Sequence, residues 1–221
     1  LEKLKLRLAA EQKAAEAAAE ALSAQRKIAA RELESRIESE LGQLSMKGVR
    51  FEVEFGRPAS GITAQGCDEV SFLMSANAGE KVGKISRIAS GGELARIMLA
   101  MKNVLSSTET IGTMVFDEVD TGVSGIAAQR VGEKLADLAS QKQVICVTHL
   151  PQIAAMADEH FCIEKTQRGD RTYTQVGRLD ENGRERELAR LTGGELVTET
   201  TLRSAAELLG AASEYKSRMG R

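Results

Sequence analysis

Aromatic residues, prolines and long apolar runs are scarce in this sequence. Its 221 residues include no tryptophan, two tyrosines, five phenylalanines and two prolines. So few aromatic rings argue against a platform on which the bases of single-stranded nucleic acid would stack. No apolar run reaches the roughly 18 residues that a transmembrane helix requires, and no signal peptide precedes the first helical pattern. We therefore expect no membrane partner.

Charge of one sign is not in excess either, because 30 basic and 32 acidic residues leave a net charge of −2. The chain as a whole generates no field that would attract nucleic acid or an anionic membrane. Cys67, Cys146 and Cys162 lie far apart without Cys-x-x-Cys spacing, so we interpret them as reduced, buried thiols of a cytoplasmic protein. The sequence starts at Leu1 within a helical pattern, which suggests a piece of a longer protein.

Residues 1–46 form the first predicted unit, a helical arm. They contain no proline and are mostly Ala, Glu, Lys, Leu and Arg. A heptad-like apolar seam follows Leu1, Leu4, Leu8, Ala15, Ala18 and Leu22. An isolated solvated helix and one helix of a coiled coil both fit this pattern. We favour the coiled coil, because the arm has too little apolar surface to form a core by itself.

The pattern changes after the arm, where we place a head over 47–215 and a frayed tail over 216–221. Alternating or apolar runs predict strands at 49–55, 68–76, 113–120, 143–150, 159–167 and 171–179. Helical spacing predicts helices over 91–106, 124–138, 184–192 and 198–211. Apolar strands that alternate with helices are typical of a parallel sheet covered on both faces, so the predicted class is α/β.

A short motif, Ser90-Gly91-Gly92-Glu93, opens the helix predicted over 91–106. Glycine weakens a helix by about 1 kcal/mol relative to alanine, so two glycines at a helix start require a reason. Ser90 and Glu93 have the spacing of a capping box. The small residues would equally let backbone N–H groups approach a phosphate at the positive end of the helix. The residues alone leave both interpretations open.

Two acidic residues, Asp117 and Glu118, stand at the end of an apolar strand, the edge at which open α/β sheets bind ligands. Asp117 could order a hydrated Mg²⁺, and Glu118 could orient and deprotonate a water; a solvated strand end is the alternative. His149 ends the next apolar strand and is either a surface histidine or a group that hydrogen-bonds a γ-phosphate. The loop 120–125 between them could be a simple turn.

The order and spacing of these motifs resemble the ABC-type ATPase family, whose signature motif, Walker B strand and D-loop match 89–93, 113–117 and 120–125. The resemblance implies that the γ-phosphate of an ATP held by another subunit is contacted by Ala89, Ser90, Gly91, Gly92 and Glu93. It implies Mg²⁺ binding through water by Asp117, general-base catalysis by Glu118, a switch histidine at His149, and D-loop contacts from Asp120 and Ser124. Ser124 stands where many relatives carry Asp.

With the helical arm, the segments 62–80, 84–102, 116–125 and 147–160 resemble the SMC-like group, and within it a bacterial DNA-repair branch. This resemblance implies the C-terminal lobe of an ABC-type ATPase head, with a mainly parallel sheet, flanking helices and an N-terminal coiled-coil helix. It further implies ATP and Mg²⁺ as cofactors, an ATP-dependent homodimer, DNA as a partner, double-strand break repair as the role, and a cytoplasmic, nucleoid-associated location.

A phosphate-cradling P-loop is missing from the sequence. The segment 79–86, GEKVGKIS, imitates one but has the wrong glycine spacing and lacks the hydroxyl residue after the lysine. We therefore expect the P-loop in an N-terminal half of the same head, and expect this chain by itself to be inactive.

Other readings of the sequence stay open. The chain could belong to the nucleotide-binding subunit of another ABC-type ATPase, although the helical arm argues against a transporter subunit. It could also be a catalytically inert coiled-coil interaction module. A stretch of arginines could contact DNA or be a set of solvated charges, namely Arg168, Arg171, Arg178, Arg184 and Arg186.

Overall fold

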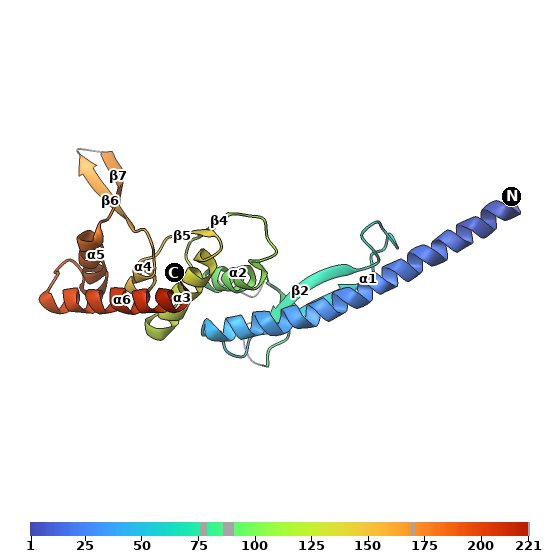
Figure 1. Cartoon of the computed structure of the whole chain (residues 1–221), viewed down its shortest axis with the longest axis horizontal. Coiled ribbons are helices and arrows are strands. Elements are labelled where there is room, and N and C mark those ends of the chain that lie inside the picture. The colour runs from blue at the N-terminus through green and yellow to red at the C-terminus, as the bar shows by residue number, and fades with distance from the viewer. Residues whose placement is uncertain (76–78, 86–90, 169–170, 221) are drawn as a thin grey trace. The chain divides into compact units, whose positions relative to one another are not determined.

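The computed structural model describes residues 1–75, 79–85, 91–168 and 171–220 (Figure 1). The chain divides into two compact units, residues 1–89 and 90–221. The predicted division into arm, head and tail stays a prediction. Within the predicted tail, however, the last helix continues to Arg218, so residues 216–218 are helical rather than frayed.

The first unit pairs one long helix with a small antiparallel sheet. Its elements are α1 (Glu2–Gln43), β1 (Arg50–Gly56), β2 (Glu69–Ser75) and β3 (Gly83–Lys84), and the strand order is β1-β2-β3. β1 and β2 pair from Arg50–Ser75 to Gly56–Glu69. Fully buried apolar side chains from the helix end and the sheet form the core, namely Ile37, Leu41, Leu44, Phe51 and Met74.

Helix α1 has two different halves. In its second half one face is buried, at Ala19, Ser23, Ala30, Ile37 and Leu41, with the spacing of a helical stripe. Residues 1–18 are exposed throughout, and the seam leucines Leu1, Leu4 and Leu8 are 91%, 69% and 59% exposed. This long N-terminal helix fits the predicted coiled coil. None of the helices in the described ranges has the length and apolar character needed to cross a membrane.

Polar contacts tie α1 to the sheet and its loop. The carboxylates of Glu34 and Glu38 accept hydrogen bonds from the backbone N–H groups of Val53 (2.7 Å) and Phe51 (3.0 Å) on β1. These N–H groups lie on the edge of the sheet and would otherwise lack a strand partner. In the β1–β2 loop, Asp68 accepts from the Ser23 hydroxyl at 2.7 Å, and this bond is the main cause of the lowered pKa of Asp68.

The second unit carries the predicted motifs. Its elements are α2 (Gly91–Leu105), β4 (Thr113–Phe116), α3 (Gly125–Ala139), β5 (Gln143–Cys146), α4 (Pro151–Ala155), β6 (Phe161–Arg168), β7 (Arg171–Arg178), α5 (Glu181–Gly193) and α6 (Glu199–Arg218). The α/β class is confirmed, and the predicted helices are present with shifted ends. The short α4 and the two-residue β3 are additions to the prediction.

The predicted sheet is only partly parallel. β4 and β5 pair in parallel, from Thr113–Gln143 to Phe116–Cys146, whereas the other two sheets of the described residues are antiparallel. The prediction that the sheet is covered on both faces was also wrong for the β4–β5 pair in this chain. Met114 and Phe116 are buried, but Val115, Ile145 and Val147 are 66%, 49% and 48% exposed. Because side chains alternate between the faces of a strand, one apolar face is packed and the other is open.

Helices α4, α5 and α6 pack around a separate apolar cluster, in which Leu188 is completely buried with Met156, Ala189 and Ala205. Next to them the hairpin β6–β7 stands out from the helices (Figure 1). The hairpin was predicted, and it pairs antiparallel from Phe161–Arg178 to Arg168–Arg171. Through α4 the cluster is connected in sequence to the chain segment that follows β5.

Candidate functional site

The parallel pairing of β4 and β5 brings two predicted site segments to one edge. Phe116 lies opposite Cys146, and the N–H of Val147 donates to the Phe116 carbonyl over 3.0 Å. The segment after β4, which begins with Asp117, therefore starts next to the segment after β5, which contains His149. The prediction placed His149 on the strand itself, but β5 ends at Cys146. The two segments leave the same edge of the sheet, as ligand-binding loops do in α/β folds.

Glu118 has an unusual backbone conformation that directs its side chain. Its φ is +57°, in the left-handed region that costs a non-glycine residue about 1–2 kcal/mol. Such strain is frequent at functional sites. The Glu118 Oε2 atom lies 3.1 Å from the position that a Cβ on Gly91 would occupy. An exposed carboxylate thus meets the N-terminus of α2, where the helix dipole favours negative charge.

Asp117 is exposed beside it, and one of its carboxylate oxygens, Oδ1, accepts from the Glu118 N–H at 2.9 Å. Its second carboxylate oxygen is available for a further ligand. Among the described residues no cluster of three or more His, Cys, Asp or Glu could hold a metal ion. A single exposed carboxylate such as Asp117 could contribute one ligand to a Mg²⁺ that keeps waters and phosphate oxygens as its other ligands, which is the usual mode for this ion.

The start of α2 is packed tightly against the loop after Glu118. A Cβ on Gly92 would stand only 2.6 Å from the Thr121 carbonyl oxygen, so glycine permits this approach. The buried Arg96, one turn further along α2, donates from Nη1 to the same oxygen at 2.7 Å. Helix α2 and the loop are thereby fixed to each other at a single carbonyl.

Asp120 connects this loop to the segment after β5. Its side chain is 4% exposed, and its Oδ2 accepts from the Thr148 hydroxyl at 2.7 Å and from the His149 backbone N–H at 3.0 Å. The same oxygen lies 3.0 Å from Nδ1 of the His149 ring. The ring itself is 74% exposed. The buried Asp120 carboxylate therefore holds the segment after β5 in place, and the His149 imidazole is the accessible group of the pair.

Comparison with curated proteins gives close relatives for this arrangement. The chain is 42% identical over 204 residues to the DNA repair protein RecN of Treponema pallidum, covering 90% of this chain and 36% of that protein. The RecN proteins of Bacillus subtilis (42%; 87% and 36% covered) and Rickettsia prowazekii (45%; 85% and 34% covered) are similar to the same extent. This chain matches the C-terminal portion of RecN. It spans about a third of the length of these RecN proteins.

The fold is also found among SMC proteins. A crystal structure of the Smc head domain with a coiled coil and joint from Pyrococcus yayanosii aligns with a TM-score of 0.55 and 20% identity. It covers 76% of this chain and 30% of that structure, and at this identity it supports the fold alone. No protein-family model matches the sequence. The predicted resemblance to the SMC-like group, and within it to a bacterial DNA-repair branch, is thus confirmed.

In this RecN-like chain the structure gathers some predicted site residues and separates others. Gly91, Gly92 and Glu118 converge at the N-terminus of α2. Ser124 is the exposed N-cap of α3 and makes no side-chain capping bond, and Glu93 lies in the first turn of α2. Ala89 and Ser90, including the predicted capping box, lie outside the described residues. The roles of all these residues toward a nucleotide stay predictions.

Three residues of the RecN-like site escaped the sequence analysis. Arg96 resembles any polar residue on a helix, and Thr121 takes part through its backbone carbonyl, so neither gives a sequence signal. Thr148, next to His149, offered a weak one, because a hydroxyl beside a candidate histidine often helps to fix its loop. The contacts of all three depend on residues about 25–30 positions away, which no local pattern reveals.

The cysteines are all free, but only Cys67 is buried, which corrects the prediction of three buried thiols. Cys146 and Cys162 are half-buried. Burial, together with the nearby Asp120 and Asp117, raises the pKa of Cys146 to about 12. Its thiol therefore stays protonated at neutral pH and is a poor nucleophile.

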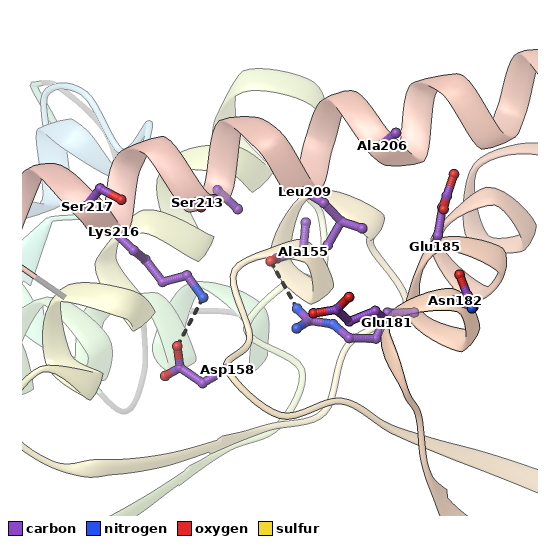
Figure 2. Close-up of a pocket in the computed structure, with 12 residues that line it drawn as sticks. Ala155, Asp158, Glu181, Asn182, Glu185, Ala206, Leu209, Ser213, Lys216 and Ser217 are labelled. Carbon is purple, nitrogen blue, oxygen red and sulfur yellow. Dashed lines mark hydrogen bonds and ion pairs between the residues drawn. The ribbon is translucent and has the colours of Figure 1, made fainter.

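A cavity of about 610 Å³ lies beside α5 and α6, and none of the predicted nucleotide-site residues lines it (Figure 2). Its two cationic side chains already have partners. Lys216 pairs with Asp158 at 3.0 Å, and Arg184 donates to the carbonyls of Ala157 (2.7 Å) and Ala155 (3.5 Å). These contacts hold the segment after α4 against the two helices. We assign the cavity a structural role.

The predicted basic stretch is not one free surface. Arg178 on β7 is engaged by both carboxylate oxygens of Glu159, and Arg184 is half-buried in the contacts just described. Arg171 and Arg186 are exposed, on the hairpin and on α5. The side chain of Arg168 lies outside the described residues. DNA contact by this stretch stays a prediction.

Gly92→Ala tests the tight packing of α2 on the loop. The new methyl group would need the Thr121 carbonyl to move by several tenths of an ångström, and we expect the free energy of unfolding to fall by about 1–3 kcal/mol. Urea denaturation measures this change. The matched control is Gly210→Ala, in α6 with open space around it, which should raise stability by about 0.5–1 kcal/mol. Equal effects of the two changes would contradict the packing argument.

Proposed function

We propose that this chain is the C-terminal half of an SMC-like ATPase head that binds and hydrolyses ATP in DNA double-strand break repair. The observation that supports this most directly is that the Glu118 carboxylate lies beside the N-terminus of α2. The strained Glu118 extends its carboxylate from the end of β4 to the N-terminus of α2 at Gly91. A water-activating acid and a phosphate-binding helix end would then lie next to each other.

In this proposal the N-terminus of α2 accepts the γ-phosphate of an ATP that is bound to a second copy of the protein. Asp117 holds Mg²⁺, through water, at the end of β4. When bound, the ion would neutralise the charge of the phosphates. Glu118 orients the attacking water and accepts its proton, and the exposed ring of His149 contacts the γ-phosphate. D-loop contacts from Asp120 and Ser124 were also predicted; Asp120 is occupied internally, so its contribution would be indirect.

The remaining half of the head must supply the P-loop. The open apolar face of the parallel pair, with Val115, Ile145 and Val147, is a suitable surface for further strands or helices of that half. Exposed β-branched side chains on a sheet face are unfavourable in water, so covering them would stabilise the complete head. DNA as a partner, and a cytoplasmic, nucleoid-associated location, rest on the similarity to DNA repair proteins.

The 221-residue chain alone is expected to show no ATP hydrolysis above background, because its sequence contains no segment with the residue spacing of a P-loop. Addition of the P-loop half, as a separate polypeptide or within the complete protein, should restore Mg²⁺-dependent hydrolysis. Release of inorganic phosphate measures both. Steady turnover by the chain alone would contradict the split-head proposal, and failure of restoration would favour an interaction module.

A further inference from the structure

We propose that Asp120 is a positioning residue for His149, holding the imidazole through Nδ1 so that Nε2 is the ring atom offered to the nucleotide. This inference rests on the proposed function. The sequence resemblance treated Asp120 as a nucleotide contact of the loop. In the structure its carboxylate is instead buried and directed to the segment after β5.

The distance between Asp120 and the ring of His149 favours one position of the ring proton. A carboxylate at neutral pH only accepts hydrogen bonds, so the 3.0 Å separation of Asp120 Oδ2 and His149 Nδ1 is favourable when Nδ1 carries the proton. Nε2 is then the unprotonated nitrogen of a side chain that is 74% exposed.

The backbone at His149 is fixed by the same oxygen. Asp120 Oδ2 accepts from the Thr148 hydroxyl and from the His149 N–H, so the histidine is held both at its backbone and at its ring. One residue further on, the Thr121 carbonyl is held by Arg96 of α2. Two adjacent loop residues, Asp120 and Thr121, thus link His149 by hydrogen bonds to the first turns of α2.

The chain allows a direct spectroscopic test, because it contains only two histidines. In the ¹⁵N-histidine-labelled 221-residue chain, we expect neutral His149 to carry its proton on Nδ1. His160 serves as an internal reference, since burial, and next Arg184, lower its pKa and keep its ring neutral. Asp120→Asn should shift His149 toward the Nε2-protonated tautomer, because an amide N–H can face Nδ1 only when Nδ1 is unprotonated.

Thr148→Val is the matched control, because it removes another donor to the same carboxylate oxygen but leaves the ring contact. It should leave the tautomer of His149 unchanged. An unprotonated Nδ1 in the parent chain overturns the proposal, and this result is obtained even if Asp120→Asn fails to fold. A tautomer shift in Thr148→Val identical to that in Asp120→Asn also overturns the proposal.

A second test uses single-turnover hydrolysis in the complete protein. Asp120→Asn should slow it about 10–100-fold, the usual cost of removing a partner that orients a functional histidine. In a His149→Ala background the same change should have little further effect, because Asp120 acts through the ring. A full additional loss in that background overturns the positioning role. If His149→Ala itself hydrolyses ATP normally, the proposed function of His149 fails while the spectroscopic result stands.

Discussion

Glu118→Gln in the complete protein is expected to slow single-turnover ATP hydrolysis by about 10²–10⁴-fold, the typical contribution of a general base. Glutamine keeps the size and hydrogen-bonding shape of the side chain but cannot accept the proton of the attacking water. ATP binding should persist, because the phosphate contacts at the N-terminus of α2 are unchanged. An ATP-bound dimer should therefore live longer, which size-exclusion chromatography with light scattering detects.

Two variants make this test specific. Glu195→Gln changes an exposed glutamate between α5 and α6 and should leave hydrolysis unchanged. Asp117→Asn should differ from Glu118→Gln by weakening Mg²⁺-dependent retention of ATP, because it removes the carboxylate proposed to hold the ion. If Glu118→Gln hydrolyses bound Mg²⁺-ATP at the parental rate, the general base is another group.

Leu188→Ala should cause the largest loss of stability among single core changes that we consider. Leu188 is completely buried in the cluster of α4, α5 and α6, and truncation of a buried leucine costs about 2–5 kcal/mol. For a chain of this size each kcal/mol lowers the melting temperature by about 2–4 °C. Thermal unfolding followed by circular dichroism should therefore show a decrease of roughly 5–20 °C.

The control is Leu196→Ala, the same substitution at a leucine that is 81% exposed. Its effect should stay within about 0.5 kcal/mol, as is usual for surface positions. Ala154 and Ala155 of α4 belong to the cluster, and α4 begins directly after the His149 segment, so Leu188→Ala should also increase hydrogen exchange in that segment. Equal destabilisation by the two variants would mean that the cluster does not stabilise this unit.

Local patterns were sufficient to predict most elements of this fold. Apolar spacing located α2 and α3, and alternating or apolar runs located β1, β2, β4 and the β6–β7 hairpin. The five-residue α4 was missed although Pro151 at its start is a known helix signal. The number of parallel strands and the open face of β4–β5 were not predictable, because they depend on pairing across the chain rather than on local periodicity.

The candidate site shows the same division between local and distant information. Adjacent acids at a strand end, and glycines at a helix start, identified Asp117, Glu118, Gly91 and Gly92. No local pattern indicates that Glu118 adopts a left-handed conformation or that Asp120 is buried against the His149 segment. Those features arise where three chain segments meet, and each contact joins residues far apart in sequence.

The two carboxylates of α1 on the edge of β1 set a unique axial register for the arm. Four helix residues advance about 6.0 Å and two strand residues about 6.6 Å. The spacing of Glu34 and Glu38 along the helix therefore matches the spacing of the Val53 and Phe51 N–H groups along the strand. Sliding by one helical turn would bring Ala30 or Gly42 into one of these places, and neither has a carboxylate. A pull along the arm is therefore transmitted to β1 instead of being lost by slippage.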